Sequence, residues 1–227
     1  DANLLAKKTG YRVAHQHRSA CIKVSNAAPL APVLFRQLFK RREKNIIVIN
    51  GGGIANITVL PANHHEDIVG YDTGPANGPI DSLVRYFAQT RPTELPCDMQ
   101  QAQYDHNGLL AASGKLILPL QQRLLADEYF TRPIKQKSAD RSHFDLNWIG
   151  TDFLKQHTAA DLCYTTAMVI ATTITDAIQQ HYKEENSLIY FYGGMSHNRF
   201  IMQTIAQQLK EQQQDSIGSL SSLGFHL

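Results

Sequence analysis

The sequence predicts an α/β fold in which sheets are flanked by helices, and three observations support this. Runs rich in β-branched or aromatic residues, such as Ile46–Ile49 and Ser187–Tyr192, have the length and composition of buried strands. Glycine clusters follow both runs. Segments such as Pro79–Gln89 place apolar residues at helical spacing. Strands that alternate with helices form layered sheets, whose ligands gather at the carboxyl ends of the strands.

The composition indicates a globular protein with a sizeable core. The chain has 227 residues, of which 43% are hydrophobic, and its 22 basic and 20 acidic side chains leave a net charge of +2. This balance provides no bulk attraction for nucleic acid, and no apolar run reaches the roughly 20 residues of a membrane span. We therefore expect neither a nucleic-acid partner nor a membrane partner.

The cysteine pattern predicts reduced thiols in a cytoplasmic protein. Cys21, Cys97 and Cys163 are isolated, and no Cys and His residues have zinc-ligand spacing, so no protein-held metal site is expected. The chain begins at Asp1 without a charged and apolar leader, and it ends abruptly at Leu227. We expect a piece of a longer protein.

The first segments are predicted to be helices separated by extended chain. Ala2–Thr9 is helical and ends at Gly10, a usual helix stop after basic residues, and Tyr11–Ala14 is extended. Ala31–Lys40 places its apolar residues on one helical face. The basic residues at its end are expected to complement the helix dipole in solvent rather than to bind nucleic acid.

The middle of the chain is predicted to contain most of the sheet. Ile46–Ile49 and Ile54–Leu60 can form a hairpin across three glycines, and Asp67–Tyr71 is a third short strand. A turn at Asp72–Pro75 then leads into the helix Pro79–Gln89. The turn therefore lies between a strand and a helix.

The rest of the chain is predicted to be mainly helical. Arg91–Asn107 is an irregular, Pro-rich loop, where we place the connection between residues 1–90 and 91–227. A polar loop at Gln212–Asp215 ends the last helix. The other predicted elements are the helices Asn107–Ser113, Pro119–Ala126, Asn147–Gln156 and Ala160–Tyr182, the strand Ser187–Tyr192 and the helix Arg199–Glu211.

The first candidate for chemistry is the glycine turn within Asn50–Thr58. Successive glycines let backbone N–H groups approach a phosphate, and the following Asn56 and Thr58 add polar side chains. The order matches neither a Walker loop nor a dinucleotide-binding fingerprint. A plain hairpin turn explains the glycines equally well.

The second candidate is Asp72, which follows a strand and precedes a Gly-Pro pair. A carboxylate at the mouth of a sheet can accept a proton or hold Mg²⁺ through water. An Asx-turn is the structural alternative. Asp81, about one helical turn into the next helix, is either a second acid or a charge near the helix dipole.

The third candidate is the glycine pair Gly193-Gly194, which again lies between a strand and a helix. A ligand pressed against these glycines would meet little steric bulk. Ser196 or Asn198 is expected to cap the following helix, and His197 receives no catalytic role. The stretch Tyr104–Gly108 either touches a ligand or begins a helix through an Asx motif.

Six stretches of the sequence resemble motifs of the anhydro-N-acetylmuramic acid kinase family. They occur in the family's order across nearly the whole chain, which argues against a chance match. They are Asn50–Thr58 (NGGGIANIT), Gly70–Asn77 (GYDTGPAN), Tyr104–Gly114 (YDHNGLLAASG), Leu124–Phe130 (LLADEYF), Phe144–Trp148 (FDLNW) and Tyr192–Asn198 (YGGMSHN).

The resemblance implies a two-lobed kinase with ribonuclease-H-like (actin-like ATPase) lobes, each a mixed sheet flanked by helices. Residues 1–90 would hold part of the first lobe and the start of the second-lobe sheet, and 91–227 the helix-rich second lobe. Family members use ATP and Mg²⁺ to open the 1,6-anhydro ring of a muramic acid sugar and phosphorylate its 6-oxygen. This reaction serves cytoplasmic peptidoglycan recycling, and a homodimer is the family expectation.

The resemblance also implies roles for individual residues. Asp72 would be the general base that takes a proton from the water attacking the anomeric carbon. The nucleotide would be contacted by Gly52, Gly53 and Asn56 near its phosphates and by Gly193 and Gly194 near its nucleoside. The sugar would be contacted by Thr73, Gly74 and Asn77.

The chain departs from the family pattern in several places. Of a glycine-rich family stretch that ends in GAPL, this chain keeps only Ala28-Pro29-Leu30, and Ala20 stands where the family has a sugar-binding Asp. The family's PKSTGRE segment corresponds to Lys135–Arg141, where the sequence matches it poorly. An N-terminal phosphate loop and a C-terminal acidic element of the family are absent. The alternatives are a superfamily kinase for another carbohydrate, or a degenerate member that binds nucleotide or sugar without catalysis.

Overall fold

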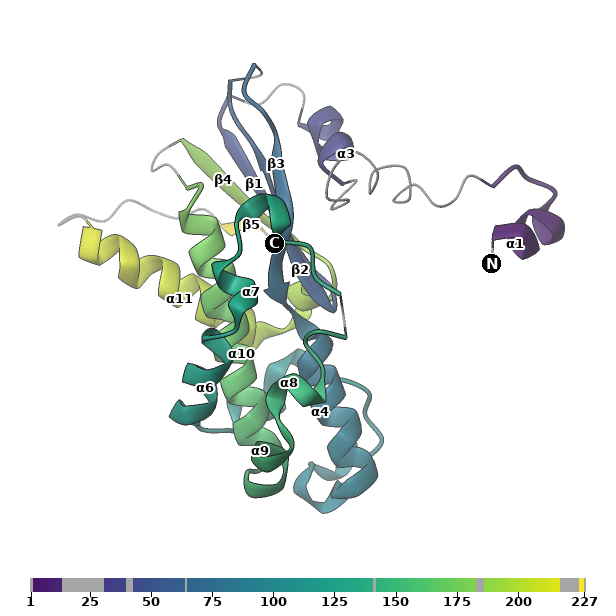
Figure 1. Cartoon of the computed structure of the whole chain (residues 1–227), viewed down its shortest axis with the longest axis vertical. Helices are drawn as coiled ribbons and strands as arrows, with labels where there is room; N and C mark the ends of the chain where they lie inside the picture. The colour runs from purple at the N-terminus through teal and green to yellow at the C-terminus, as the bar shows by residue number, and fades with distance from the viewer. Residues whose placement is uncertain are drawn as a thin grey trace.

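The fold is built on one five-stranded sheet with the strand order β3-β2-β1-β4-β5 (Figure 1). The computed structural model describes residues 2–13, 31–39, 43–63, 65–140, 142–182, 186–216 and 225–226. The strands are β1 (Asn45–Gly51), β2 (Ile54–Leu60), β3 (Val69–Pro75), β4 (Ser187–Tyr192) and β5 (Phe225–His226).

The strand directions confirm the predicted fold class. The pairs β1–β2 and β2–β3 are antiparallel, whereas β1–β4 and β4–β5 are parallel. A three-strand meander extended by parallel strands on the side of its first strand is the ribonuclease-H-like sheet. The hairpin across the glycines is confirmed, with Gly51 opposite Ala55.

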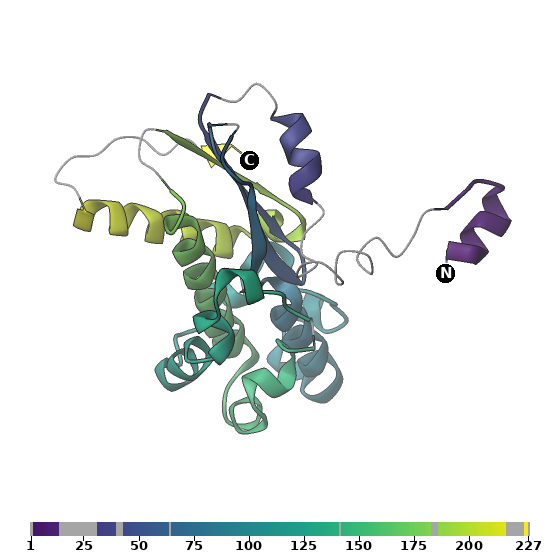
Figure 2. The ribbon, with the colours of Figure 1, turned by 45° about the horizontal axis from the view of Figure 1, so that its top comes forward.

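Most helices lie on one side of the sheet or beyond one end of it (Figure 1). The long helix α10 packs against α4, α5, α6, α11 and β3. Figure 2 shows α3 on the opposite side of the sheet from α10, and α1 apart from the sheet, with no buried residue of its own. The helices are α1 (Ala2–Thr9), α3 (Ala31–Leu38), α4 (Asn77–Thr90), α5 (Leu109–Ala112), α6 (Leu118–Leu125), α7 (Glu128–Thr131), α8 (Leu146–Ile149), α9 (Thr151–Gln156), α10 (Ala159–Gln179) and α11 (Arg199–Ser216).

The main hydrophobic core lies between the sheet and these helices. Ile47, Ile49, Ile57 and Tyr71 point from one face of the sheet into a cluster with apolar side chains of α4, α10 and α11. Both halves of the chain contribute to this cluster. The division at residue 90 stays a prediction.

The third strand begins two residues later and ends four residues later than the predicted Asp67–Tyr71. Asp72–Pro75 forms part of β3 instead of a turn, because this segment continues to pair with β2 up to Pro75 opposite Ile54. A register shift at Ala55 and Asn56, together with the positive φ of 146° at Gly74, accommodates this irregular end. Only Ala76 separates the strand from α4.

Two further expectations are wrong in detail. The helix predicted over Asn147–Gln156 is divided into α8 and α9 at Gly150, whose φ of 91° is not helical. The segment Gln212–Asp215 continues α11 instead of forming a loop, which agrees with the good helix propensity of Gln. Irregular segments of the predicted loop after α4 form the short 3₁₀ helices η1 (Pro92–Glu94), η2 (Cys97–Met99) and η3 (His106–Gly108).

The first two helices follow the prediction where they are described, and the extended stretch expected over Tyr11–Ala14 stays a prediction. The helix α1 ends at Gly10, whose φ is +72°, and the N–H of Gly10 donates to the carbonyl oxygen of Ala6. The predicted ends at Ala14 and Lys40 lie outside the described residues, as does Cys21. Cys97 and Cys163 are free thiols.

Candidate functional site

Three strand ends meet at one edge of the sheet. Since β1, β3 and β4 run in the same direction, their carboxyl ends lie together, followed respectively by the glycine turn, by α4 and by Gly193-Gly194. The N–H of Asn77 donates to the carbonyl oxygen of Gly52 over 3.0 Å. A Cβ on Gly193 would lie only 2.6 Å from the carbonyl oxygen of Gly51. This edge is where ligands of α/β sheets bind.

The glycine turn holds the start of α4. The carbonyl oxygen of Gly53 accepts hydrogen bonds from the N–H groups of Ala76, at 3.1 Å, and Gly78, at 3.2 Å. A Cβ on Gly78 would lie 2.7 Å from that oxygen, so the two segments approach as backbones. The structural alternative for the glycines, a hairpin turn, is thus confirmed, while contact with phosphate stays a prediction.

A row of polar side chains crosses the sheet face that points away from α10. Asn50, Asn56 and Asp72 are directly opposite one another in β1, β2 and β3, and we call them the polar row. Residues opposite each other in neighbouring strands project from the same face. The structure therefore brings two predicted site residues together, Asn56 and Asp72, and adds Asn50.

Asp72 is held by segments distant in the sequence. Its Oδ2 accepts a hydrogen bond from the N–H of Ala139 at 2.9 Å, and its N–H donates to the carbonyl oxygen of Lys137 at 3.1 Å. The hydroxyl of Tyr129 donates to its carbonyl oxygen at 2.7 Å. Residues 135–140, the described part of the segment that departs from the PKSTGRE pattern, thus lie beside the candidate base.

An aromatic cluster supports Tyr129. Its ring contacts Phe130 and Phe144 edge to face, with ring centroids 5.7 and 5.3 Å apart. The carboxylate of Asp127 accepts hydrogen bonds from the N–H of Tyr129 at 2.8 Å and the indole of Trp148 at 3.0 Å. Burial, and then the charge of Asp72, raises the pKa of the Tyr129 phenol. The LLADEYF and FDLNW stretches, residues 124–130 and 144–148, therefore pack against each other beside Asp72.

Two predicted sugar-site residues have local structural roles. Thr73 is buried, and its hydroxyl donates to the carbonyl oxygen of Ala55 at 3.3 Å. Gly74 combines a positive φ with close packing, because a Cβ there would lie 2.8 Å from the ring of Phe130. Neither Thr73 nor Gly74 belongs to the polar row.

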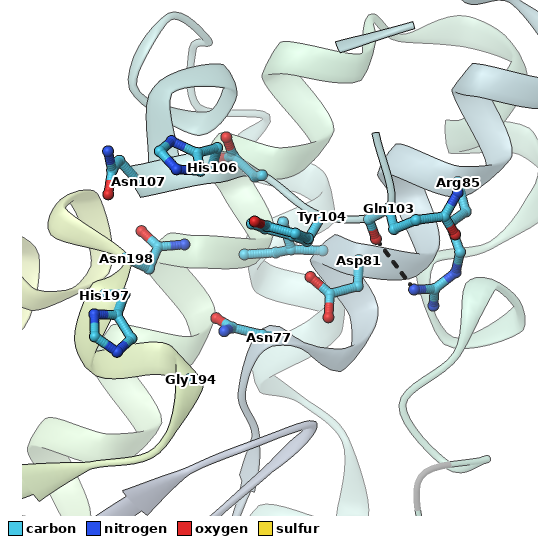
Figure 3. Close-up of a pocket in the computed structure, with 12 residues that line it drawn as sticks. Asn77, Asp81, Arg85, Gln103, Tyr104, His106, Asn107, Gly194, His197 and Asn198 are labelled. Carbon is cyan, nitrogen blue, oxygen red and sulfur yellow. Dashed lines mark hydrogen bonds between the residues drawn. The ribbon is translucent and has the colours of Figure 1, made fainter. Parts of the chain in front are cut away.

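A pocket of about 560 Å³ lies next to the strand ends (Figure 3). Of the predicted site residues, only Asn77 and Gly194 line it, so the polar row and the pocket are separate parts of this edge. Asn77 has a buried side-chain oxygen without a hydrogen-bond partner in the described part of the chain. The other lining residues are Ile80, Asp81, Arg85, Gln103, Tyr104, Asp105, His106, Asn107, His197 and Asn198.

Two carboxyl groups make the pocket electrostatically unusual. Burial, and secondarily the charge of Asp105, raises the pKa of Asp81 to about 6, although Arg85 opposes the shift. Burial also raises the pKa of Asp105. The two Asp105 oxygens accept hydrogen bonds from the N–H groups of Leu110 and Ala111, both at 2.9 Å. Asp105 thus holds the start of α5 through N–H groups five and six residues further on, instead of through the expected Asx motif, and its neighbours line the pocket.

The other capping expectation is settled in favour of Asn198. Its Oδ1 accepts a hydrogen bond from the N–H of Ile201 at 3.1 Å at the start of α11, whereas the Ser196 hydroxyl donates to the carbonyl oxygen of Gly193. Across the described residues, no three His, Cys, Asp or Glu side chains lie close enough to hold a metal ion. Within the same part of the chain, no helix is long and apolar enough to cross a membrane.

Sequence reasoning missed Tyr129, Ala139 and Asn50 around Asp72, and it left Asp81 undecided. The period of β1 could have identified Asn50, because it continues the alternation of Ile46 and Val48. No local signal could have identified the contacts of Tyr129 and Ala139 with Asp72, which depend on the tertiary fold.

Comparisons with known proteins point to one family. A family model described as anhydro-N-acetylmuramic acid kinase matches residues 1–225. The protein of that name from Idiomarina loihiensis is 33% identical over 222 residues, which cover 97% of this chain and 56% of the relative. The one from Nitrosomonas europaea is 34% identical over 208 residues, covering 91% and 53% respectively.

The chain spans about half the length of these curated relatives. Among solved structures, the activator of the 2-hydroxyisocaproyl-CoA dehydratase from Clostridium difficile, solved with bound ADPNP, has a TM-score of 0.42 and 13% identity, with coverage of 97% of this chain and 84% of that chain. That similarity is too low to support a conclusion. The family match over residues 1–225 is decisive, and the chain belongs to the anhydro-N-acetylmuramic acid kinase family.

Proposed function

We propose that the protein containing this chain is an ATP-dependent carbohydrate kinase. Its substrate would be 1,6-anhydro-N-acetylmuramic acid and its product N-acetylmuramic acid 6-phosphate, formed in the cytoplasm during peptidoglycan recycling. Family membership supports the reaction class. The observation that carries the proposal is the position of Asp72 in a polar row, at the sheet edge where three strand ends meet.

In this reaction Asp72 acts as the general base. It takes a proton from water as the water oxygen bonds to the anomeric carbon. The bond from that carbon to the bridging 6-oxygen breaks, and the 6-oxygen bonds to the γ-phosphorus of ATP while ADP leaves. The hydrogen bond from the N–H of Ala139 to Oδ2 orients the carboxylate, and the hydroxyl of Tyr129 holds the backbone carbonyl of the same residue. Positioning of this kind is a large part of catalysis by such enzymes.

The residues of the edge suit a nucleotide. A Cβ on Gly52 or Gly194 would meet its nearest neighbour at 3.7 Å, an ordinary van der Waals contact, so neither glycine is closed off by the fold and a ligand can approach its backbone. Gly52, Gly53 and Asn56 would lie near the phosphates, and Gly193 and Gly194 near the nucleoside. Thr73 and Gly74 would shape the sugar side through the backbone, and Asn77 would contact the sugar.

The polar row also suits Mg²⁺. One carboxylate, from Asp72, and two amide oxygens, from Asn50 and Asn56, share a face, and Mg²⁺ commonly keeps several waters while binding one or two carboxylates and substrate phosphates. When bound, the ion would neutralise charge on the transferred phosphoryl group. A homodimer is part of the proposal on family grounds. A superfamily kinase for another carbohydrate and a non-catalytic member stay the alternatives.

The test is the substitution Asp72→Asn in the complete gene product, assayed with ATP and the anhydro sugar. We expect kcat to fall about 10²- to 10⁴-fold with nucleotide affinity kept, because general-base help contributes that much. The control is Asp67→Asn, an exposed carboxylate just before β3. Equal turnover by wild type and Asp72→Asn would remove Asp72 from the mechanism, and phosphorylation of a different sugar alone would favour the first alternative.

A further inference from the structure

The pocket contains one carboxylate to which the described residues donate no hydrogen bond. Asp81 lies about one turn into α4, and its side chain points into the space between Asn77 and Tyr104 (Figure 3). In the described part of the chain it makes neither a hydrogen bond nor an ion pair. A half-buried carboxylate without a partner costs free energy, which suggests that a ligand supplies the missing donors.

Arg85, whose charge acts on Asp81, makes no ion pair with it. Arg85 is four residues further along α4, a spacing at which Asp and Arg often pair. Its guanidinium instead donates to the carbonyl oxygen of Gln103 at 3.2 Å and to the hydroxyl of Ser82 at 3.1 Å. The interaction with Gln103 is visible in Figure 3.

The second carboxyl group of the pocket, that of Asp105, already has hydrogen-bond partners. Both oxygens of Asp105 accept backbone hydrogen bonds at the start of α5. Asn77, by contrast, has a buried oxygen with no partner among the described residues. Asp81 and Asn77 therefore leave hydrogen-bond acceptors unsatisfied. The Asn77 oxygen is the one proposed above to contact the carbohydrate substrate, and the ligand group that meets Asp81 must carry donors of its own.

The charge of the pocket selects which part of a nucleotide can enter. The carboxyl groups of Asp81 and Asp105 interact electrostatically, so a phosphate placed beside them would be repelled. A neutral nucleoside would not be repelled, and about 560 Å³ is within the usual range for a small-molecule site. This arrangement would direct the phosphates towards Gly52 and the polar row.

We propose that Asp81 recognises the ribose of the nucleotide by accepting hydrogen bonds from its 2′- and 3′-hydroxyls. This inference rests on the proposed function, which supplies the nucleotide. A carboxylate is an effective acceptor for two vicinal hydroxyls, and acidic side chains bind ribose in this way in dinucleotide-binding folds. Gly194 lies on the same pocket wall and provides room for the nucleoside.

Hydroxyl groups of the carbohydrate substrate have the same hydrogen-bonding chemistry as ribose. The distinguishing measurement uses ADP and 2′-deoxy-ADP, which differ in one hydroxyl and contain no second sugar. Calorimetric titration of the complete gene product gives both affinities without requiring turnover. The variants are Asp81→Ala and the isosteric Asp81→Asn, and the matched control is Asp152→Asn, an exposed carboxylate of α9 outside the pocket.

We expect the wild type to bind ADP about 10- to 100-fold more tightly than 2′-deoxy-ADP, since a hydrogen bond to a charged group has that effect on affinity. Asp81→Ala should weaken ADP binding by a similar factor and bind the two nucleotides equally. Asp152→Asn should retain the discrimination. Circular dichroism and thermal unfolding establish that each variant is folded.

Three results would overturn the inference. Equal binding of ADP and 2′-deoxy-ADP by the wild type would exclude recognition of the 2′-hydroxyl while leaving nucleotide binding intact. In the complete gene product, a raised KM for the sugar with unchanged nucleotide affinity in Asp81→Asn would assign the carboxylate to the carbohydrate. Absence of nucleotide binding by the wild-type complete gene product would overturn the proposed function and this inference together.

Discussion

The two faces of the sheet differ although the same strands form both. On the face towards α10, Ile49, Ile57 and Tyr71 lie side by side and are almost completely buried in the main core. On the other face, Asn50, Asn56 and Asp72 occupy the adjacent positions in each strand. A shift of one residue along a strand therefore separates packing from candidate chemistry.

The second face also changes character along its length. Ile46, Val48 and Leu60 form a small apolar cluster there, with Phe35 and Phe39 packed against it. Towards the carboxyl ends of β1 and β3 the cluster gives way to the polar row. The comparison indicates that one face chiefly provides stability, whereas the polar end of the other is where we propose that the ligand binds.

The pair Ile57→Ala and Asn56→Ala tests this comparison most strongly. Ile57 is 0% exposed, and its truncation should lower the free energy of unfolding by about 2–5 kcal/mol, because lost burial and a cavity add together. Asn56→Ala should change stability by no more than about 0.5 kcal/mol. Urea unfolding of the full chain measures both effects.

For catalytic activity, the two substitutions should have the opposite ranking, with the larger loss in Asn56→Ala. We expect Asn56→Ala to lower kcat/KM for ATP in the complete gene product about tenfold, through loss of one contact near the phosphates. At a temperature where it is folded, Ile57→Ala should retain its kcat/KM. Similar losses of stability in the two variants would contradict the division between the faces.

The glycines after β4 provide the second test. Gly193 has a φ of 90°, and an added Cβ would lie 2.6 Å from the carbonyl oxygen of Gly51, so Gly193→Ala should cost about 1–3 kcal/mol of unfolding free energy. At Gly194 the nearest atom to an added Cβ is the Asn77 amide nitrogen at 3.7 Å.

Gly194→Ala should therefore fold normally but place a methyl group in the space proposed for the nucleoside. We expect its ADP affinity to fall at least about tenfold in calorimetric titration with little change in Tm. Unchanged ADP affinity in a folded Gly194→Ala protein would argue that the ligand does not approach this glycine. Gly193→Ala is the matched control, since its defect should appear first in Tm.

The fold was largely predictable because its signals are local. Ile46–Ile49 and Ile54–Leu60 have strand composition, and three glycines between them indicate a hairpin. The end of β3 was not predictable in this way, because Gly74-Pro75 usually marks a turn, whereas pairing with β2 extends the strand. Tertiary pairing overrode the local preference there.

The site was predictable only in part, for a related reason. Asp72 and the glycine clusters were recognisable from their positions after strands, and the structure places them at one edge of the sheet. The environment of Asp81 was not, because its exposure and its unpaired state depend on where Arg85 and Asp105 lie. Only the assembled pocket distinguishes a second acid from an ordinary helix-start charge.

The smallest expected effect is the pH dependence caused by Asp81. Burial raises the pKa of its carboxyl group from 3.8 to about 6 in the folded chain, so between these values the folded state binds more protons than the unfolded state. The free energy of unfolding should therefore fall as pH rises through this window. Asp81→Asn removes that dependence.

The comparison must be made between wild type and variant, because burial also raises the pKa of Asp105 and Asp176 with the same sign. We expect Asp81→Asn to be more stable than wild type at pH 7.5, by no more than about 1 kcal/mol because the carboxylate borders an open pocket, and the difference should vanish near pH 4. If Asp81→Asn were less stable than wild type at pH 7.5, Asp81 would have a structural partner, and its carboxylate would stabilise the fold instead of being available to a ligand.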